Sequence, residues 1–363
     1  MKTKLVKINK TNLHVPEMVE AANIIRQGGL VAFPTETVYG LGANALKEEA
    51  AERIYAAKGR PSDNPLIAHI ANVLDLKILV SEIPEAAEGL IEKYWPGPLT
   101  IIFPKSTLVP YQTTGGLDTV AVRMPSDPVA NYLIELSGVP IAAPSANVSG
   151  RPSPTTAEHV FEDMNGRIEM ILDSGPVGIG LESTIVDATG KVPVLLRPGA
   201  ITIEMLWETV GEVQIDPAIL EPMKEGAKPK APGMKYRHYA PKAELILVEN
   251  ETQQIKETAR NDDNSKVVET INRLAYEEIA RGHKVGIICT NETRNLYPLD
   301  VEIRSLGKRE QEEMIAHNLF GVLREFDELD VDIIYSESFA QKHLGQAIMN
   351  RLTKAAGYHI LKV

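Results

Sequence analysis

The stretch Leu30–Gly42, LVAFPTETVYGLG, changes from an apolar run into small, hydroxylated and acidic side chains. The apolar run Leu30–Phe33 predicts a β-strand, and the residues from Pro34 to Gly42 predict a polar turn in which that strand ends. Ligands of open α/β sheets bind outside strand ends, so Thr35 is a candidate binding residue. A threonine in a turn is also ordinary, and that alternative stays open.

The chain continues into a predicted helix, Lys47–Ala57, and then into a polar loop, Lys58–Pro65, KGRPSDNP. The loop places Lys58 and Arg60 on either side of a glycine. Lysine offers a phosphate group a point charge, arginine offers it a planar fork, and glycine lets the backbone approach closely. The loop is therefore a candidate anion site. As an alternative, Lys58 complements the dipole at the helix C-terminus and caps carbonyl groups there.

A second predicted strand, Leu66–Ile70, is interrupted by His69. A histidine inside an apolar strand is a satisfied core residue more often than a ligand-binding one. The strand end at Thr35, the Lys-x-Arg loop and this histidine nevertheless follow one another closely in the sequence. Their coincidence favours a functional site.

A third predicted strand, Val139–Ala143, ends in Pro144–Gly150, PSANVSG, and so repeats the passage from an apolar run into small polar residues. No hydroxyl group stands in a Gly-x-Ser-x-Gly elbow, so a covalent nucleophile is not indicated. Catalysis by positioning and charge stabilisation fits the residue types better. The candidate pocket for a polyanion and a small polar molecule combines cations with hydroxyl groups: Lys58, Arg60, Arg123, Arg197, Thr35, Ser145 and Ser183.

The composition is that of a soluble globular protein long enough for two domains. Of the 363 residues, 44% are hydrophobic and 24% are charged, and the formal net charge is -11. This acidic balance argues against broad binding of nucleic acid, because such binding depends on neutralising phosphates. Direct binding of nucleic acid is therefore not expected.

One cysteine, Cys289, excludes an intramolecular disulfide and suits a reducing cytoplasm. No export signal and no apolar run of about 20 residues is found, so the expectation is a cytoplasmic protein without a membrane partner. Neither a Walker A loop nor a His-Glu-x-x-His motif is present, and the glycines of 174–180 lack the dinucleotide spacing. No protein-held metal site is expected.

The periodicity predicts a mixed α/β arrangement over the first part of the chain. Its further helices are expected at Pro16–Gln27, Pro84–Trp95, Asp127–Leu136 and Thr156–Met164, and its further strands at Leu99–Phe103, Thr119–Met124, Met170–Asp173 and Ser183–Asp187.

Residues 216–241 are rich in proline and lysine and predict an extended linker. Within it, Pro232–Pro241, PGMKYRHYAP, is too aromatic and basic for a plain spacer, so we expect it to dock on another part of the protein.

After the linker, strands and helices alternate in the pattern of a parallel sheet. Strands are expected at Leu245–Val248, Val285–Cys289 and Val331–Tyr335, and helices at Val267–Arg281, Lys308–Phe326 and His343–Ala356. The strand ends contain no phosphate loop and no catalytic triad, which indicates a structural or regulatory role.

A set of short motifs resembles the threonylcarbamoyl-AMP synthases, the YrdC-like family. The matching segments are Pro34–Leu41, Lys58–Pro61, Pro65–His69, Trp95–Thr100, Val122–Pro125, Pro144–Asn147, Glu182–Asp187 and Leu196–Gly199. These segments follow one another in the same order as in the family. The linker and the residues after it are similar to the family's long, two-domain form.

The resemblance implies that L-threonine, bicarbonate and ATP give L-threonylcarbamoyladenylate and pyrophosphate. A downstream threonylcarbamoyl transferase would use the product to modify tRNAs that read codons beginning with A. Mg²⁺ bound through the ATP phosphates is the one cofactor implied. The amine of threonine would form a carbamate, whose oxygen attacks the α-phosphorus of ATP.

The same resemblance assigns roles to individual residues. Threonine would contact Thr35, His69, Arg123, Ser183 and the backbone near Ala143. ATP would lie among Lys58, Arg60, Ser62, Ser145, Asn147, Arg197 and Tyr236, of which Lys58, Arg60 and Arg197 would stabilise charge during catalysis.

The fold that the resemblance implies is an open, twisted α/β sheet followed by a small Rossmann-like parallel α/β domain. The expected boundaries are 1–211 for the catalytic domain, 212–242 for a linker that closes over the active site, and 243–363 for the C-terminal domain. Two alternatives remain, an RNA-binding module and a carbamoyl transferase of the hydrogenase-maturation type. The acidic charge weighs against the first, and the lack of acylphosphatase and zinc-finger segments weighs against the second.

Overall fold

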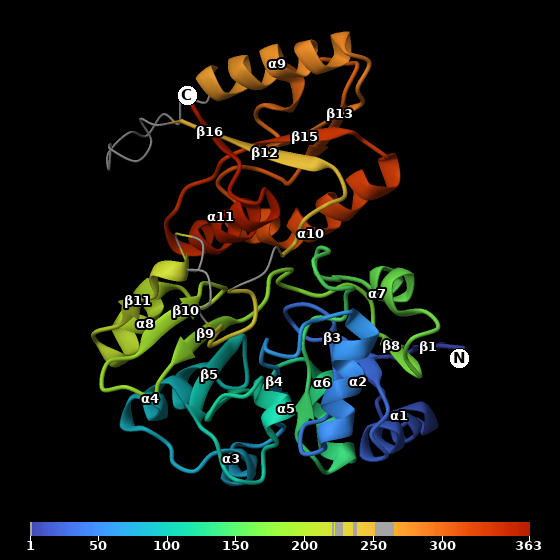
Figure 1. The fold of residues 1–363 in the computed structure, drawn as a ribbon, viewed down its shortest axis with the longest axis vertical. Coiled ribbons are helices and arrows are strands. Elements are labelled where there is room, and N and C mark those ends of the chain that lie inside the picture. The colour runs from blue at the N-terminus through green and yellow to red at the C-terminus, as the bar shows by residue number, and fades with distance from the viewer. Residues whose placement is uncertain (1, 220, 222–227, 235–237, 251–264) are drawn as a thin grey trace. The chain divides into compact units, whose positions relative to one another are not determined.

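The computed structural model describes residues 2–219, 221, 228–234, 238–250 and 265–363. The chain divides into two compact units, one made of residues 1–149 and 153–236, the other of residues 150–152 and 237–363. Both units combine helices with a sheet (Figure 1), so the predicted α/β class is confirmed. Among the described residues, no helix is long and apolar enough to cross a membrane.

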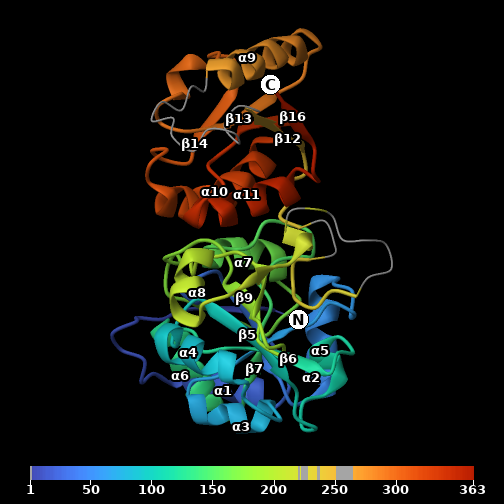
Figure 2. The same ribbon diagram turned by 90° about the vertical axis from the view of Figure 1, so that its left-hand side faces the viewer.

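An 11-stranded mixed sheet forms the first unit, in the order β1-β8-β2-β3-β7-β4-β6-β5-β9-β10-β11. Figure 2 shows its helices gathered around these strands. The strands are β1 (Lys4–Lys7), β2 (Val31–Phe33), β3 (Gly40–Asn44), β4 (Ile67–His69), β5 (Leu99–Pro104), β6 (Thr119–Arg123), β7 (Ile141–Ala142), β8 (Met170–Asp173), β9 (Thr184–Asp187), β10 (Val194–Arg197) and β11 (Gln214–Ile215).

The helices of the first unit are α1 (Pro16–Arg26), α2 (Glu48–Lys58), α3 (Leu76–Leu79), α4 (Glu85–Tyr94), α5 (Tyr111–Thr114), α6 (Pro128–Ser137), α7 (Ala157–Met164) and α8 (Ile203–Val210), with 3-10 turns at η1 (Val73–Asp75) and η2 (Pro217–Ile219). Five of them, α1, α2, α4, α6 and α7, begin and end close to the residues that the sequence predicts. Helix α6 illustrates the local cause, because the Asp127 side chain accepts hydrogen bonds from the N–H groups of Val129 and Ala130 at its N-terminus.

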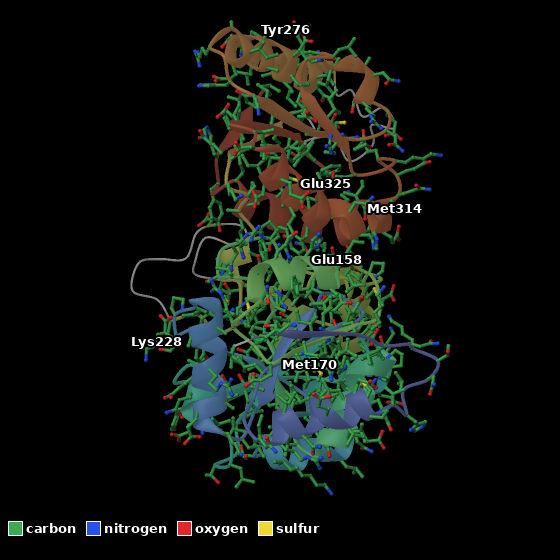
Figure 3. The ribbon with its side chains drawn as sticks, turned by 90° about the vertical axis from the view of Figure 1, so that its right-hand side faces the viewer. Glu158, Met170, Lys228, Tyr276, Met314 and Glu325 are labelled. Carbon is green, nitrogen blue, oxygen red and sulfur yellow. The ribbon has the colours of Figure 1, made fainter. Side chains whose placement is uncertain are left out.

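One face of this sheet is only partly covered by helices. Helices α1 and α6 pack on Val31, Phe33 and Ile141, in a layer that includes Met170, labelled in Figure 3. Further along the sheet, residues of β4, β5, β6 and β9 pack instead against Ala231 and Met234 of the predicted linker. The linker therefore docks on the sheet, as its composition suggests.

The predicted turn after Pro34 is shorter than expected. Gly40–Asn44 forms strand β3, which pairs with β2 in antiparallel register. Its glycines explain the difference, since a Cβ atom at Gly42 would lie 2.7 Å from Cε1 of Phe33 and 2.8 Å from Cγ2 of Ile141. The glycines allow two strands to approach a packed aromatic ring, a requirement that the local sequence does not reveal.

Helices α3, α5 and α8 and strand β11 lie where no element is predicted. The short α5 lies in the connection between β5 and β6, and α8 begins where Thr202 accepts a hydrogen bond from the N–H of Met205. Strand β11 lies inside the predicted linker and pairs with β10. The linker boundaries at 212 and 242 otherwise stay a prediction.

The second unit contains a five-stranded sheet in the order β14-β13-β15-β12-β16, whose strands pair in parallel. The strands are β12 (Glu244–Glu249), β13 (Val285–Cys289), β14 (Glu302–Ser305), β15 (Ile333–Glu337) and β16 (Ile360–Lys362), and the helices are α9 (Ser265–Ala280), α10 (Glu312–Leu329) and α11 (His343–Ala355). Helix α9 covers one face, while α10 and α11 lie on the other (Figure 1). The sequence did not indicate β14 or β16.

Two glycines of the first unit differ in how closely other atoms surround them, and substitution of each by alanine tests that difference. A Cβ atom at Gly199 would lie 2.5 Å from the backbone N of Thr184, whereas one at Gly89, inside α4, would meet nothing closer than 3.8 Å. We expect Gly199→Ala to lower the free energy of unfolding by about 1–3 kcal/mol. Gly89→Ala should raise it by up to about 1 kcal/mol, because alanine is the better helix former. Urea denaturation of both variants measures this, and equal effects would contradict it.

Candidate active site

Three neighbouring strands place polar residues in one row on the partly covered face. His69 of β4 lies opposite Arg123 of β6, and Arg123 lies opposite Thr100 of β5. Directly opposed residues in a sheet point to the same side. The row therefore projects from the face that carries the linker residues rather than from the helix-covered face.

Arg123 is buried, at 4% exposure, and three residues from two segments of the chain hold its guanidinium. Its Nη2 pairs with Oε1 of Glu36 at 2.7 Å, its Nη1 donates to Oγ1 of Thr37 at 2.9 Å, and its Nε donates to the carbonyl of Gly97 at 3.3 Å. Burial by itself would raise the pKa of the Glu36 carboxyl, but the charge of Arg123 and the hydrogen bonds outweigh burial and hold the pKa below its usual range.

Thr35 lies in the turn between β2 and β3. Its Oγ1 donates to the carbonyl of Val38 at 2.7 Å and lies 2.9 Å from Oγ1 of Thr37. Thr35 therefore stabilises the turn, as the ordinary interpretation of a turn threonine predicts. The same contacts join Thr35 to Thr37, which binds Arg123, so the turn and the row belong to one network.

His69 is buried, at 3% exposure. Its Nδ1 lies 3.1 Å from the carbonyl of Ile67 and 3.3 Å from that of Ile141. Because carbonyl oxygens only accept, Nδ1 carries the proton and Nε2 is left as an acceptor. Burial, followed by the charge of Arg123, lowers the pKa of His69 to about 3. The imidazole is a neutral hydrogen-bonding group.

A second group of contacts continues the row across β5, β9 and β10. Oγ of Ser183 lies 2.7 Å from Oγ1 of Thr100. Arg197 donates from Nη2 to Oγ of Ser183 at 3.2 Å and from Nε to the Ser183 carbonyl at 3.0 Å. Its Nη1 reaches the carbonyl of Pro232 at 3.4 Å. The structure thus joins two predicted residues, Ser183 and Arg197, to the docked linker.

A third group surrounds Lys58, the last residue of α2, which is 1% exposed. Its Nζ donates to the carbonyl of Ser145 and to that of Asn147, the latter at 2.6 Å. Oγ of Ser145 donates to Oδ1 of Asn147 at 2.6 Å. Lys58 therefore binds the predicted strand end at Ser145, and it also stands in the last turn of α2, where its charge complements the helix dipole.

The strand ends at Thr35 and Ser145 are neighbours in the sheet. Gly40 and Ser145 form an isolated β-bridge, and the N–H of Ala146 donates to the carbonyl of Tyr39. The N–H of Ala143 donates to the carbonyl of Ile67 at 2.8 Å. The two predicted polar ends, far apart in the sequence, lie side by side.

The remaining predicted residues are less closely tied to these groups. Arg60 donates from Nη2 to the carbonyl of Pro65 at 3.1 Å, within its own loop, and Ser62 is exposed on that loop. Tyr236 lies outside the described residues. Placement of the nucleotide around these three stays a prediction.

Five residues of the network were missed from the sequence: Glu36, Thr37, Gly97, Thr100 and Pro232. Thr100 had a signal, because it is the polar residue in the apolar strand Leu99–Phe103. Glu36 and Thr37 stand in the quoted turn, but nothing local shows that they bind Arg123. The role of the Pro232 carbonyl depends on linker docking alone.

The arrangement combines buried guanidinium groups, hydroxyl groups and a neutral imidazole. Guanidinium groups bind carboxylates and phosphates through paired N–H groups. Cations, hydroxyls and amides dominate the donor set, and in the part of the chain that the structure describes no three His, Cys, Asp or Glu side chains form a group able to hold a metal ion. The site suits an acidic small molecule and a phosphorylated one.

Two family models match the chain. One is described as telomere recombination and matches residues 23–199, and the other is described as the C-terminal domain of threonylcarbamoyl-AMP synthase and matches residues 201–357. The threonylcarbamoyl-AMP synthase of Pyrococcus abyssi is 53% identical, covering 94% of this chain and 95% of the relative. The Bacillus subtilis threonylcarbamoyl-AMP synthase is 46% identical, covering 100% of both.

A solved structure is similar over the same length. The crystal structure of Pyrococcus abyssi Sua5 complexed with L-threonine has a TM-score of 0.89 and 50% sequence identity, covering 100% of each chain.

The imidazole of His69 should stay neutral on acidification to about pH 4, because its pKa lies near 3 instead of the usual value of about 6.5. The unfolded chain then takes up the proton first. Below about pH 6.5 this histidine therefore lowers the stability of the fold, by up to about 1.4 kcal/mol per pH unit, until about pH 3. Imidazole ¹⁵N chemical shifts measured from pH 7 to pH 4 check the prediction. Protonation near pH 6 would contradict it.

Proposed function

The chain belongs to the threonylcarbamoyl-AMP synthase family, and we propose that it converts L-threonine, bicarbonate and ATP into L-threonylcarbamoyladenylate and pyrophosphate. The product serves threonylcarbamoyladenosine modification of tRNA. The observation that carries the proposal is the 53% identity with a threonylcarbamoyl-AMP synthase over 95% of that relative's length. The buried cation and hydroxyl network on one sheet face supports it.

Arg123 is the proposed anchor for the carboxylate of threonine. A guanidinium has five N–H groups. Glu36, Thr37 and Gly97 each engage one of its nitrogens, and Nη1 and Nη2 each carry a second hydrogen. These two hydrogens match the two oxygens of a carboxylate. The neutral Nε2 of His69 would accept from a threonine donor, with Thr35, Ser183 and the Ala143 backbone beside it.

The nucleotide is proposed to lie toward Ser145 and Arg197. Lys58, Arg60 and Arg197 would offset the negative charge that spreads over the transferring phosphorus, and Ser62, Ser145, Asn147 and Tyr236 would provide further contacts. The donor groups in this region suit phosphate oxygens better than a metal ion. Mg²⁺ is therefore proposed to be held by the ATP phosphates, where it would neutralise charge on the departing pyrophosphate.

Charge stabilisation and positioning would carry the reaction. The amine of threonine attacks the carbon of bicarbonate-derived CO2 and loses a proton, giving a carbamate. A carbamate oxygen then attacks the α-phosphorus of ATP, and the bond to pyrophosphate breaks. His69 is a poor general base, because a group with a pKa near 3 holds a proton weakly at neutral pH.

The linker is proposed to act as a lid. Ala231 and Met234 pack on the site face, Pro232 contacts Arg197, and Lys230 lies 3.7 Å from the carboxylate of Asp187. The predicted nucleotide contact Tyr236 follows directly in the sequence. A closed linker would keep water from the carbamate and the mixed anhydride, both of which hydrolyse readily.

The cellular setting is part of the proposal. A cytoplasmic location suits the single buried thiol of Cys289. The product would pass to a separate threonylcarbamoyl transferase, and the net charge of -11 argues against direct binding of tRNA.

The first test is release of pyrophosphate from ATP by the purified full-length protein with Mg²⁺. We expect release that requires threonine and bicarbonate together, because the carbamate is the attacking group. Omission of either substrate is the control. Release without threonine would contradict the proposed acceptor and favour the carbamoyl-transferase alternative.

A second test addresses the threonine anchor. Arg123→Lys keeps the charge but loses the planar fork, so we expect the KM for threonine to rise about tenfold to a hundredfold while the KM for ATP changes little. Steady-state pyrophosphate release at varied threonine measures it. Arg53→Lys is the matched control, since the Arg53–Glu169 ion pair lies near the surface, with 41% of the Arg53 side chain exposed. An unchanged threonine KM in Arg123→Lys would remove the assignment.

A further inference from the structure

We infer that the second unit binds a small aliphatic amine in a pocket at the carboxyl ends of β13 and β15. The proposed synthase reaction makes no use of this pocket. The ligand class is defined by an apolar body and a protonated amine.

The order of the strands creates a crevice between β13 and β15. From β13 the chain passes to β14 at one edge of the sheet, and from β15 it passes through α11 to β16 at the other edge. The two connections therefore leave in opposite directions. Open parallel sheets bind their ligands outside the carboxyl ends of such a strand pair.

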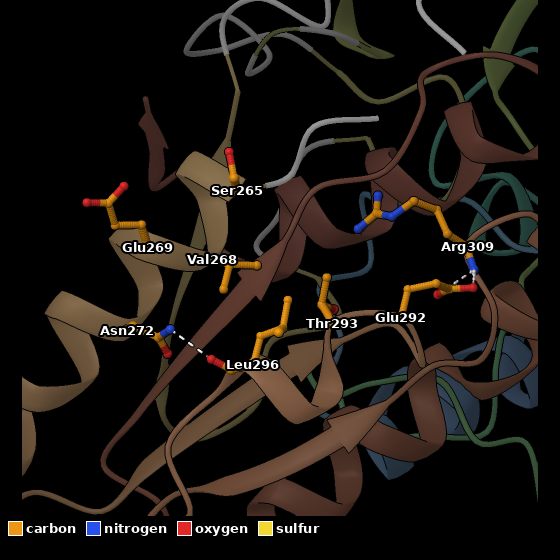
Figure 4. A pocket seen from close by; sticks show the side chains of 8 residues that line it. All are labelled: Ser265, Val268, Glu269, Asn272, Glu292, Thr293, Leu296 and Arg309. Atoms are coloured by element: carbon orange, nitrogen blue, oxygen red, sulfur yellow. Dashed lines mark hydrogen bonds between the residues drawn. The ribbon is translucent and has the colours of Figure 1, made fainter. Parts of the chain in front are cut away.

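A pocket of about 730 Å³ lies beside this crevice. Small-molecule sites range from about 300 to 1,000 Å³, so its size is suitable. Figure 4 shows Val268, Thr293 and Leu296 between two polar sides. The pocket is lined by Ser265, Val268, Glu269 and Asn272 from α9, by Glu292, Thr293 and Leu296 after β13, and by Arg309 after β14.

One wall of the pocket is held in place by a buried carboxylate. Glu337, the last residue of β15, has 0% exposure. It pairs with the guanidinium of Arg309 and accepts hydrogen bonds from the hydroxyl groups of Thr293 and Tyr297, the latter at 2.6 Å. Arg309 also donates to the carbonyl of Ser338 at 2.9 Å. A wall fixed in this way needs little reordering when a ligand binds.

The charges around the pocket favour a hydrogen-bond donor. The charge of Arg309 is balanced by Glu337, which leaves the carboxylates of Glu269 and Glu292 in excess. Glu292 accepts from the backbone N–H of Arg309 at 3.2 Å, and Asn272 donates to the carbonyl of Leu296 at 2.9 Å. A protonated amine has only donors to offer and complements the two carboxylates, Glu269 above all.

The floor of the pocket favours an aliphatic body. Leu296 is 57% exposed although it stands beside the buried Val268. Covering an exposed apolar side chain is favourable in proportion to the area removed from water. An alkyl chain lying on Leu296 would place its amine near Glu269 and Asn272.

The test compares three probes that share one alkyl chain and differ in charge: n-hexylammonium, n-hexanol and n-hexanoate. Binding to the full-length protein is measured by isothermal titration calorimetry. We expect n-hexylammonium to bind about tenfold more tightly than n-hexanol, and n-hexanoate to bind most weakly. Equal binding of all three, or tighter binding of n-hexanoate, would overturn the inference.

Variants locate the binding. Leu296→Ala should weaken n-hexylammonium binding about fivefold, because it removes apolar contact area. The matched control Leu299→Ala lies in the same connection, at 97% exposure, outside the pocket lining, and should change nothing. Glu269→Gln should reduce the preference for the amine over the alcohol. Equal affinities in the two leucine variants would place the binding elsewhere and overturn the inference, whatever the outcome of the pyrophosphate assay.

Discussion

The first unit depends on keeping the charge of Arg123 buried. A guanidinium out of water is costly unless it is paired, and removal of a buried partner typically costs about 3–5 kcal/mol. Glu36 and Thr37 from one segment and Gly97 from another supply the partners. The turn after β2, the loop before β5 and the end of β6 are thereby drawn to one point. A rigid arrangement of this kind suits a site that works by positioning a carboxylate.

The position of the site follows from uneven covering of the sheet. Strand residues alternate between faces, so each strand must bury two sides. Helices cover one side along β4, β5, β6 and β9, while α1 and α6 cover the other side near β2, β3, β7 and β8. The polar row lies where that second helical layer ends, and linker residues pack beside it. The row beneath these linker residues is held by strand pairing.

The second unit also buries a charged side chain at the end of a strand, in this case the carboxylate of Glu337. Its parallel strands end together, so their terminal carbonyl groups and polar side chains meet at one edge. Glu337 is kept there without exposure because Arg309, Thr293 and Tyr297 satisfy it. Burial of this network raises the pKa of the Cys289 thiol to about 12, with Glu337 adding to the effect, so the cysteine is an inert core residue.

The sequence by itself determined the α/β class, the extent of most helices, the parallel second sheet and most of the polar residues that meet on the site face. These features are encoded locally, by apolar periodicity, caps such as Asp127 and the passage from apolar to polar residues at strand ends. Only the tertiary structure decided that Gly40–Asn44 is a strand, that Lys58 binds the carbonyls at 145 and 147, and that Glu36 pairs with Arg123. Each of these depends on a partner distant in the sequence: the side chain of Ile141 packed on Gly42, the strand end at Ser145, and the buried charge of Arg123. Local patterns report the preferences of a segment, whereas such pairings are selected by the whole packed sheet.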